Sequence, residues 1–482
     1  MIELDGLSQC VTNWSFTCRL ANCRIVTVDE NYSQPDRISS MKEPQANEGP
    51  KPDGARSPKV ELARRFFLIA LVLASGMTGY ELGFSIPQSR YVRKLRGIGH
   101  GDLYGGDFYP LWWTSRELRE RRQNPYCDFT TFELQRHLFG YALDRTRPQG
   151  FSAHYRAFSY PLFADLIFWP FAELPFERVR ILLAIIFPAL SGLTAVLWMR
   201  SQRLSLSILV TTGTVLLYVA SYPNLEALYA LQPTIIVAAL LAATVSALIK
   251  GRYWLAGTWL ALASIKPQLT VMITPWLLLW SVSRWRSRKG LILSFAVITT
   301  IMMVGSELLV PRWFGLWVRN VFEYRTYTAP PLLPLLMGRP GEVLGVVMVA
   351  ATLYWSWTFR RVEQGDDFML IVSLLLSVTV VVFPAAGAFY EYLVLWPSFV
   401  WIYSRRGDFA GTTARWILYF SIFLLLWPYV AACGVLGWAA LGLSWNAPTM
   451  LVPIRIMISL PLISTGLLTL PLLQPIWNST FR

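Results

Sequence analysis

Long apolar runs recur along this chain from Phe66 to its C-terminus, separated by shorter segments rich in proline, glycine and charge. Many of the runs approach or exceed the roughly 20 residues that an α-helix needs to cross a bilayer. Counting the short, proline-marked pieces in different ways gives about 11–13 crossings. The expected fold class is an all-α polytopic membrane protein, because helices satisfy their own backbone groups in lipid. The predicted spans are Phe66–Ile86, Phe176–Met199, Leu204–Tyr222, Gln232–Ile249, Tyr253–Ile265 with Pro267–Val282, Gly290–Val310, Gly341–Trp357, Phe368–Ala385, Phe389–Tyr403, Thr413–Ala432 and Leu451–Leu470.

Composition and charge agree with this class. Hydrophobic residues make up 54% of the 482 residues and charged residues only 15%, against about 25% charged residues in ordinary soluble domains. The net charge of +14 is concentrated in short clusters beside the apolar runs, as in cytoplasmic loops that orient helices. We therefore expect membrane lipids, and no nucleic acid, as partners. The clusters are Arg64-Arg65, Lys250–Arg252, Arg284–Lys289, Arg360-Arg361 and Arg405-Arg406.

The first 60 residues are polar and show no sustained periodicity. They predict a disordered cytoplasmic tail, followed by one transmembrane domain at residues 61–482. No basic region followed by an apolar core precedes Phe66, so the segment does not resemble a signal peptide. Met41 is an alternative start of translation to Met1. The five cysteines show no spacing typical of a zinc site or of a disulfide framework.

Two long loops are predicted on the external side. Arg64 and Arg65 place the start of the first span in the cytoplasm, so the loop at about residues 87–157 is external. Loops of this length are usually functional or disordered, and its aromatic residues favour function. The loop at residues 311–342 is rich in aromatic residues, arginine and proline. It suits either a surface for sugar and phosphate or an aromatic belt with a connector.

The piece Phe158–Pro175 leaves the topology open, because it is apolar but short and interrupted by prolines. A full crossing there would put the basic pair Arg200 and Arg203 outside. A segment that only dips into the membrane would leave most later basic clusters inside.

Within the first external loop, Asp107 follows two glycines that permit a tight turn or the close approach of a ligand. The next residues, Tyr109–Arg122, predict an amphipathic helix with an arginine-rich face, which would lie at the lipid–water boundary. We interpret Asp107 as a carboxylate at the membrane surface that takes a proton from an acceptor hydroxyl. The alternative is that Asp107 caps the helix, since Asp is a favoured cap residue.

Charged residues inside apolar runs are costly and therefore candidates for function. Lys266 stands as a lone cation between two half-length apolar pieces, followed by Pro267 and Gln268. A helix broken at that proline exposes backbone that is tolerated only beside a cavity, where Lys266 would hold a lipid-linked phosphate. The alternative is a loop tip with a snorkelling lysine. Glu391 lies at the outer end of another span and either contacts sugar or acceptor, or faces water.

Metal and nucleotide chemistry have little support in the sequence. Asp102 and Asp107 are two acids five residues apart without further ligands, and none of the three histidines pairs with another ligand at metal spacing. The sequence contains no phosphate-binding loop of the Walker type and no dinucleotide-binding glycine motif. We expect no resident metal and no cofactor; a divalent metal is compatible with the site but not required.

Four motifs occur together in a characteristic order. They are Asp107-Phe108 in GDFYPLWWTSREL, Asn124-Pro125-Tyr126, Phe158-Ser159-Tyr160-Pro161-Leu162 and Lys266-Pro267. In this order the chain resembles glycosyltransferase family 87, the polyprenyl-phosphate-mannose-dependent mannosyltransferases of the GT-C superfamily, over about residues 65–406. Relatives often have a second proline where this chain has Leu162. Many have histidine before the tyrosine of a late His-Tyr motif, where this chain has Glu391.

The resemblance implies a GT-C fold and a membrane-bound hexosyltransferase. Asp107 would be the catalytic base of an inverting transfer from a polyprenyl-phosphate sugar, expected to be mannose, to a lipid or glycan acceptor. The site would face the periplasm or exterior of a bacterial plasma membrane. A transporter or flippase that moves a lipid or glycolipid without splitting it is the alternative. The candidate substrate-binding residues are Lys266, Tyr160, Arg156, Gln268, Glu391, Asp102, Asn124 and Tyr126.

Overall fold

The computed structural model describes residues 58–87, 104–139, 157–407, 412–442 and 460–480. Helices form nearly all of this part of the chain, which contains one isolated antiparallel bridge between Pro331 and Ala385 and no strand. The chain divides into two units, Met1–Glu61 and Leu62–Arg482. The predicted tail lies almost wholly outside the described residues, so its disorder stays a prediction.

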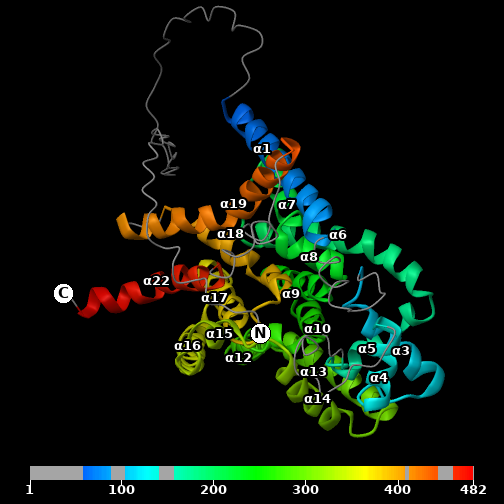
Figure 1. The fold of residues 1–482 in the computed structure, drawn as a ribbon. Coiled ribbons are helices and arrows are strands. Elements are labelled where there is room, and N and C mark those ends of the chain that lie inside the picture. Colours follow the sequence, from blue (N-terminus) through cyan, green and yellow to red (C-terminus); the bar gives the residue numbers. More distant parts are fainter. Residues whose placement is uncertain (1–57, 88–103, 140–156, 408–411, 443–459, 481–482) are drawn as a thin grey trace, which may run out of the picture. The chain divides into compact units, whose positions relative to one another are not determined.

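The helices of the described residues are shown in Figure 1. Up to residue 282 they are α1 (Pro58–Tyr80) with a π-helical turn (Glu81–Ser85), α3 (Tyr109–Arg121), α4 (Asp128–Phe139), α5 (Leu162–Ala172), α6 (Phe176–Ser201), α7 (Ile208–Val219), α8 (Tyr222–Ala230), α9 (Thr234–Ile249), α10 (Tyr253–Ala263), α11 (Pro267–Thr270) and α12 (Ile273–Val282). The later helices are α13 (Trp285–Leu309), α14 (Trp313–Tyr327), α15 (Leu332–Met337), α16 (Arg339–Thr358) with a 3₁₀ turn (Phe359–Arg361), α17 (Asp366–Val382), a 3₁₀ segment (Phe389–Leu395), α18 (Trp396–Ser404), α19 (Thr412–Ala440) and α22 (Leu460–Thr480).

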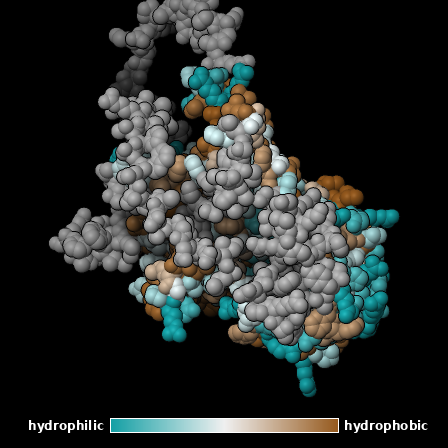
Figure 2. Space-filling model, viewed as in Figure 1, coloured by the Kyte–Doolittle hydropathy of each residue, from teal (hydrophilic) through white to brown (hydrophobic). Residues whose placement is uncertain are grey.

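The fold class predicted from the sequence is confirmed: the protein is an all-α polytopic membrane protein. In the described residues, five helical stretches are long and apolar enough to cross a membrane: Pro58–Ser85, Phe176–Ser201, Trp285–Leu309, Arg339–Arg361 and Leu418–Ala440. The pair α7 and α8, bent by 57°, makes a sixth if it is one span. Large apolar side chains such as Leu68, Ile69 and Val72 on α1 remain exposed, as lipid-facing residues do, and apolar surface is visible in Figure 2.

The number of long helices is smaller than the number of crossings counted from the sequence. Several predicted spans are divided in the structure. Residues 253–282 form α10, α11 and α12, and residues 389–403 form a 3₁₀ segment followed by the nine-residue α18. Four further apolar helices have only 10–17 residues. Proline stands in the first turn of the helix that follows two of these breaks, Pro267 in α11 and Pro397 in α18, because proline lacks a hydrogen-bond donor and clashes with the preceding turn.

Helix α5 bears on the topology that the sequence left open. Its 11 residues extend about 16 Å, roughly half the thickness of a bilayer core. By its length, α5 fits the alternative in which this segment dips into the membrane, and that alternative leaves Arg200 on the same side as the other basic clusters. The buried Asp165 of α5 accepts hydrogen bonds from Thr114 and Ser115 of α3, at 3.0 and 2.9 Å.

Helix α3 begins where the sequence predicts it, but its apolar face does not lie against lipid. Trp112, Trp113 and Leu118 are buried by the protein itself, and α3 packs on α5. The Trp112 indole donates to the Leu174 carbonyl at 2.9 Å. The expected interfacial helix is therefore an internal element that supports the preceding turn, residues 104–108.

The ends of several helices meet at the candidate residues Asp107, Lys266 and Glu391. The C-terminus of α8, the N-terminus of α9, the break between α10 and α11, and the segment after α17 meet there. The basic clusters at Lys250–Arg252, Arg284–Lys289 and Arg360-Arg361 lie at the opposite ends of α9, α12 and α16. Because α9 has 16 residues, the candidate residues at its start and the basic cluster at its end are about 24 Å apart.

Candidate active site

The turn at residues 104–108 holds Asp107 against the end of α8. The Gly105 N–H donates to the Tyr229 carbonyl at 2.9 Å, and the Asp107 N–H donates to the Ala230 carbonyl at 3.1 Å. Gly105 has φ +80°, and a Cβ there would come within 2.9 Å of the Leu231 side chain. Only glycine fits this turn without strain, so the local sequence fixes where the Asp107 carboxylate points.

Gln232 forms hydrogen bonds to both Asp107 and Lys266. Its side chain is buried, and it follows Leu231, which ends α8 in the left-handed conformation. The Gln232 Nε2 donates to Asp107 Oδ2 at 2.5 Å, and its Oε1 accepts from the Lys266 ammonium at 3.1 Å. One amide thus orients the carboxylate and the cation at the same time.

The Lys266 side chain is buried at the break between α10 and α11, with 3% of the residue exposed. Its ammonium donates to Gln232 Oε1, to Thr234 Oγ1 at 2.6 Å and to Glu391 Oε1 at 2.6 Å. These contacts use all three donors of a lysine. The interpretation of Lys266 as a lone cation is therefore corrected: it is buried beside a cavity, as the break at Pro267 suggested, and it is ion-paired with Glu391.

Glu391 occupies the position where the resemblance expects histidine, and its structural role follows from this pair. Its residue is 3% exposed, so it does not face water. A buried ammonium without a counter-ion would be very costly. The carboxylate of Glu391 offsets that cost at the point where the 3₁₀ segment 389–395 reaches the cavity.

A cavity of 140 Å³ lies between these groups. Its lining includes Asp107, Tyr160, Gln232, Lys266, Gln268 and Glu391, with further aromatic side chains from Tyr324 and Tyr390. Five of the candidates chosen from the sequence therefore lie at one cavity, although up to 284 positions separate them along the chain (from 107 to 391). Its volume is below the roughly 300–1,000 Å³ of sites that enclose drug-sized ligands, so it would take a small group such as a sugar or a phosphate.

Asn124 and Tyr126 are placed beside the cavity lining rather than in it. The Asn124 side chain accepts from the Tyr126 N–H at 2.9 Å, and the Tyr126 hydroxyl donates to the Tyr160 carbonyl at 2.9 Å. Burial, with a smaller effect of Asp165, raises the pKa of Tyr126 well above its ordinary value, so the phenol remains a donor. In this structure they hold the segment that carries Tyr160, and direct contact with substrate stays a prediction.

Arg156 and Asp102 lie outside the described residues, so their predicted roles remain predictions. In the part of the chain that the structure describes, no three His, Cys, Asp or Glu side chains are close enough together to hold a metal ion. The capping role for Asp107 is not supported, because the N-cap of α3 is Phe108 and no side chain caps that helix.

Thr234, Tyr324 and Tyr390 belong to the site but were not selected from the sequence. Thr234 follows the Gln232-Pro233 step, and Tyr390 directly precedes Glu391, so a search around the chosen residues would have included both. Tyr390 also has its ring centre 5.0 Å from the Lys266 ammonium, a cation–π distance. Tyr324 comes from α14, in the aromatic loop at 311–342, which therefore contributes to the cavity.

Residues 158–384 match the family model described as glycosyltransferase family 87. These residues belong to that family. The resemblance stated from the sequence is thereby confirmed, and the protein is a membrane glycosyltransferase that takes a sugar donor and an acceptor. No curated protein matches the chain. The matched residues include Tyr160, Gln232 and Lys266; Asp107 and Glu391 lie outside them on either side, yet line the same cavity.

Proposed function

We propose that this glycosyltransferase moves a mannosyl group from a polyprenyl-phosphate donor to an acceptor hydroxyl, with inversion and with Asp107 as the general base. The observation that supports it most strongly is the array Asp107–Gln232–Lys266 at one cavity. A base and a cation joined through one amide suit a reaction that takes up a proton at one point and releases a phosphate at another.

The proposed reaction is a single displacement. The acceptor O–H gives its proton to the Asp107 carboxylate while the acceptor oxygen forms a bond to the anomeric carbon. The bond between that carbon and the phosphate oxygen breaks on the opposite face, and the electron pair leaves with the lipid phosphate. General-base assistance typically contributes about 10²–10⁴-fold to such a rate. The hydrogen bond from Gln232 Nε2 keeps the carboxylate oriented without protonating it.

Lys266 is proposed to stabilise the departing phosphate. All three of its donors are engaged in this structure, so a phosphate oxygen must replace one partner. The two neutral acceptors, Gln232 Oε1 and Thr234 Oγ1, are easier to replace than the Glu391 carboxylate, since hydrogen bonds between charged groups are stronger than those to neutral oxygens. Glu391 would hold the lysine in place during this exchange, and the buried setting strengthens the cation's effect. No metal or cofactor takes part in the proposal.

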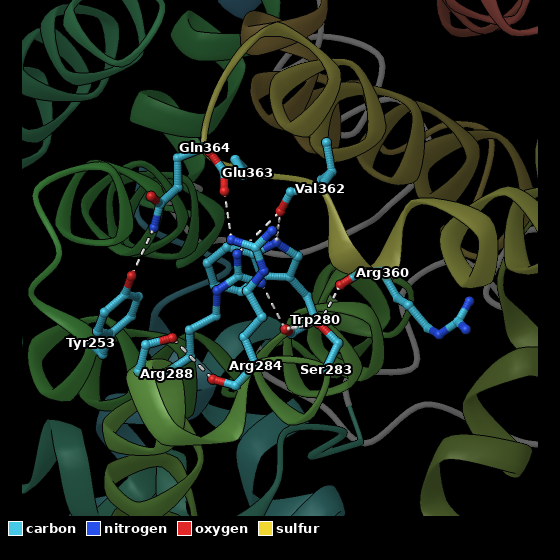
Figure 3. A network of polar contacts seen from close by, with 10 residues as sticks. Tyr253, Trp280, Ser283, Arg284, Arg288, Arg360, Val362, Glu363 and Gln364 are labelled. Carbon is cyan, nitrogen blue, oxygen red and sulfur yellow. Dashed lines mark hydrogen bonds and ion pairs between the residues drawn. The ribbon is translucent and has the colours of Figure 1, made fainter.

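The arrangement of charge supports a site on the external side of a bacterial plasma membrane. The basic clusters lie at helix ends opposite the cavity, and such clusters mark the cytoplasmic side. Figure 3 shows part of that end, where Arg284 pairs with Glu363 at 2.7 Å and Arg288 donates to the carbonyls of Trp280 and Val362. The periplasmic or exterior side is then the side on which a membrane-embedded donor presents its sugar.

The test is the Asp107→Asn variant, which keeps the shape of the side chain and removes its basicity. Membranes that contain the protein and supply the acceptor are incubated with radiolabelled polyprenyl-phosphate mannose, and release of free polyprenyl phosphate is measured beside donor binding. We expect turnover to fall by about 10²–10⁴-fold with donor affinity retained. Full turnover in the variant would refute Asp107 as the base. Movement of intact donor across vesicles by the native protein, without cleavage, would favour the transporter alternative.

A further inference from the structure

A second hollow lies at the end of α9 and α10 that is remote from the cavity. It has a volume of 380 Å³ and is formed by the turn between α9 and α10 together with the first residues of α13. Three cations line it: Arg252 from the turn, and Arg286 and Lys289 from α13. The proposed glycosyl transfer uses none of them.

Close packing of α10 on α13 fixes the shape of this hollow. A Cβ on Gly257 would come within 2.2 Å of the Leu291 carbonyl, and one on Gly290 within 3.0 Å of the Trp254 indole. At Gly257 the two backbones approach so closely that a Cβ does not fit, and at Gly290 the missing Cβ leaves room for the Trp254 indole. This contact holds the α9–α10 turn, with Arg252, beside the first turn of α13. The hollow is thus a feature of two packed helices rather than of a loose loop.

The three cations have no acidic partner within the described part of the chain, in contrast with their neighbours. Arg284 pairs with Glu363, and Arg288 is buried over the Trp280 ring with its guanidinium bonded to carbonyls. Arg252, Arg286 and Lys289 instead point their charge to an exposed hollow. Helix α13 also begins here with no side chain capping it, so its N-terminus adds partial positive charge. The hollow is built for an anion with several acceptor oxygens, which a phosphate provides.

The surface beside the hollow distinguishes a lipid phosphate from a free one. After Lys289 along α13, Leu293, Val297 and Ile301 are exposed. They are spaced four residues apart and therefore lie on one face of the helix. Trp254, which lines the hollow, and Trp285, which directly precedes Arg286, are 59% and 46% exposed, as aromatic residues are at membrane interfaces. A free phosphate would make no contact with these apolar side chains, whereas the acyl chains of a lipid would pack against them.

We propose that Arg252, Arg286 and Lys289 bind the phosphate of an anionic glycerophospholipid whose acyl chains lie along α13. The site is independent of the proposed mannosyl transfer and lies on the face that carries the basic clusters. Each cation near a membrane surface contributes enough attraction for about a fivefold change in lipid binding.

The test is binding of phosphatidylglycerol to the full-length protein in detergent, followed by native mass spectrometry. The variants are Arg286→Gln with Lys289→Gln, and separately Arg252→Gln. The matched control is Arg361→Gln, an exposed cation of the same helix-end region that does not line the hollow. Phosphatidylcholine and inorganic phosphate are the comparison ligands, and thermal unfolding without added lipid shows that each variant is folded.

We expect one phosphatidylglycerol to bind more tightly than phosphatidylcholine, with affinity reduced about tenfold or more in the double variant, about fivefold in Arg252→Gln and less than twofold in the control. Equal losses in the control would overturn the proposal in favour of non-specific attraction to the basic face. Binding of inorganic phosphate as tight as that of phosphatidylglycerol would overturn the lipid assignment. If the double variant is unfolded, the single variant decides by the same criteria.

Discussion

Lys266 and Glu391 form a buried ion pair with Nζ and Oε1 2.6 Å apart, although 125 positions separate them in the chain. The pair joins the break between α10 and α11 to the 3₁₀ segment after α17, and thereby closes one wall of the cavity. Asp107 reaches the same pair through Gln232. Four segments that are distant in sequence are therefore tied together by a single polar network, and most of the predictions below follow from it.

Removing Glu391 should destabilise the protein strongly. Glu391→Ala leaves a buried ammonium without its counter-ion, which typically costs about 3–5 kcal/mol. Unfolding in detergent should show this loss. The control is Glu120→Ala, since Glu120 forms an exposed pair with Arg116 at 3.0 Å and such pairs are worth about 0–1 kcal/mol.

The matched double variant Lys266→Met with Glu391→Leu should recover at least half of the stability lost in Glu391→Ala, because two apolar side chains replace both charges. Its transferase activity should stay low, since the proposed phosphate-binding cation is gone. If Glu391→Ala is as stable as Glu120→Ala, the pair does not support the fold as argued.

Replacing Gln232 should shift the pH dependence of turnover. The donor on Gln232 favours the charged form of Asp107, and a base acts when deprotonated, so Gln232→Met should move the loss of activity in acid to a higher pH. The acid side of the kcat profile is the measurement. Gln268→Met, at the other glutamine of the cavity, should change KM and leave the acid limb in place; an unshifted limb in Gln232→Met would contradict the role of this hydrogen bond.

Gly105→Ala should impair both the stability and the activity. With φ +80° and a Leu231 methyl 2.9 Å from the position of a Cβ, alanine would strain the turn by about 1–3 kcal/mol and displace Asp107. Thermal unfolding and kcat are the two measurements. Gly315→Ala on α14 is the control, because nothing lies within 4 Å of a Cβ there; equal behaviour of the two variants would show that the turn does not require glycine.

The Arg284–Glu363 pair, at the helix ends remote from the cavity, should make a small pH-dependent contribution to the stability of the protein. The hydrogen bond from Arg284, and then its charge, lower the pKa of Glu363 below its ordinary value. A lowered folded-state pKa stabilises the protein above the unfolded value, near pH 4, and the effect is lost as pH falls through the folded value. Glu363→Gln should remove this component of the unfolding curve between pH 5 and 3. Added salt should weaken it in the native protein, since the pair is exposed; insensitivity to both changes would contradict the pairing.

Several features of the site could be predicted because they depend on local rules. Asp107 could be selected because the two preceding glycines indicate a constrained turn. Lys266 could be selected because a charge inside an apolar run, before a proline, is costly in lipid. Gln232 gives only a weak signal in the sequence, since a glutamine at the start of an apolar helix carries no charge whose burial would be costly. Its importance comes from its two partners, which no local pattern contains.

The sequence by itself determined that the chain is an all-α membrane protein, how its basic clusters are distributed, and which costly side chains need an explanation. These follow from backbone hydrogen bonding in lipid and from the cost of burying charge, which act on each segment separately. Only the tertiary structure decided that the apolar face of α3 packs on α5 instead of lipid, and that Lys266 has Glu391 as its counter-ion. Those outcomes depend on which distant helix ends meet, and contacts between distant segments are set by packing of the whole domain rather than by any one stretch of residues.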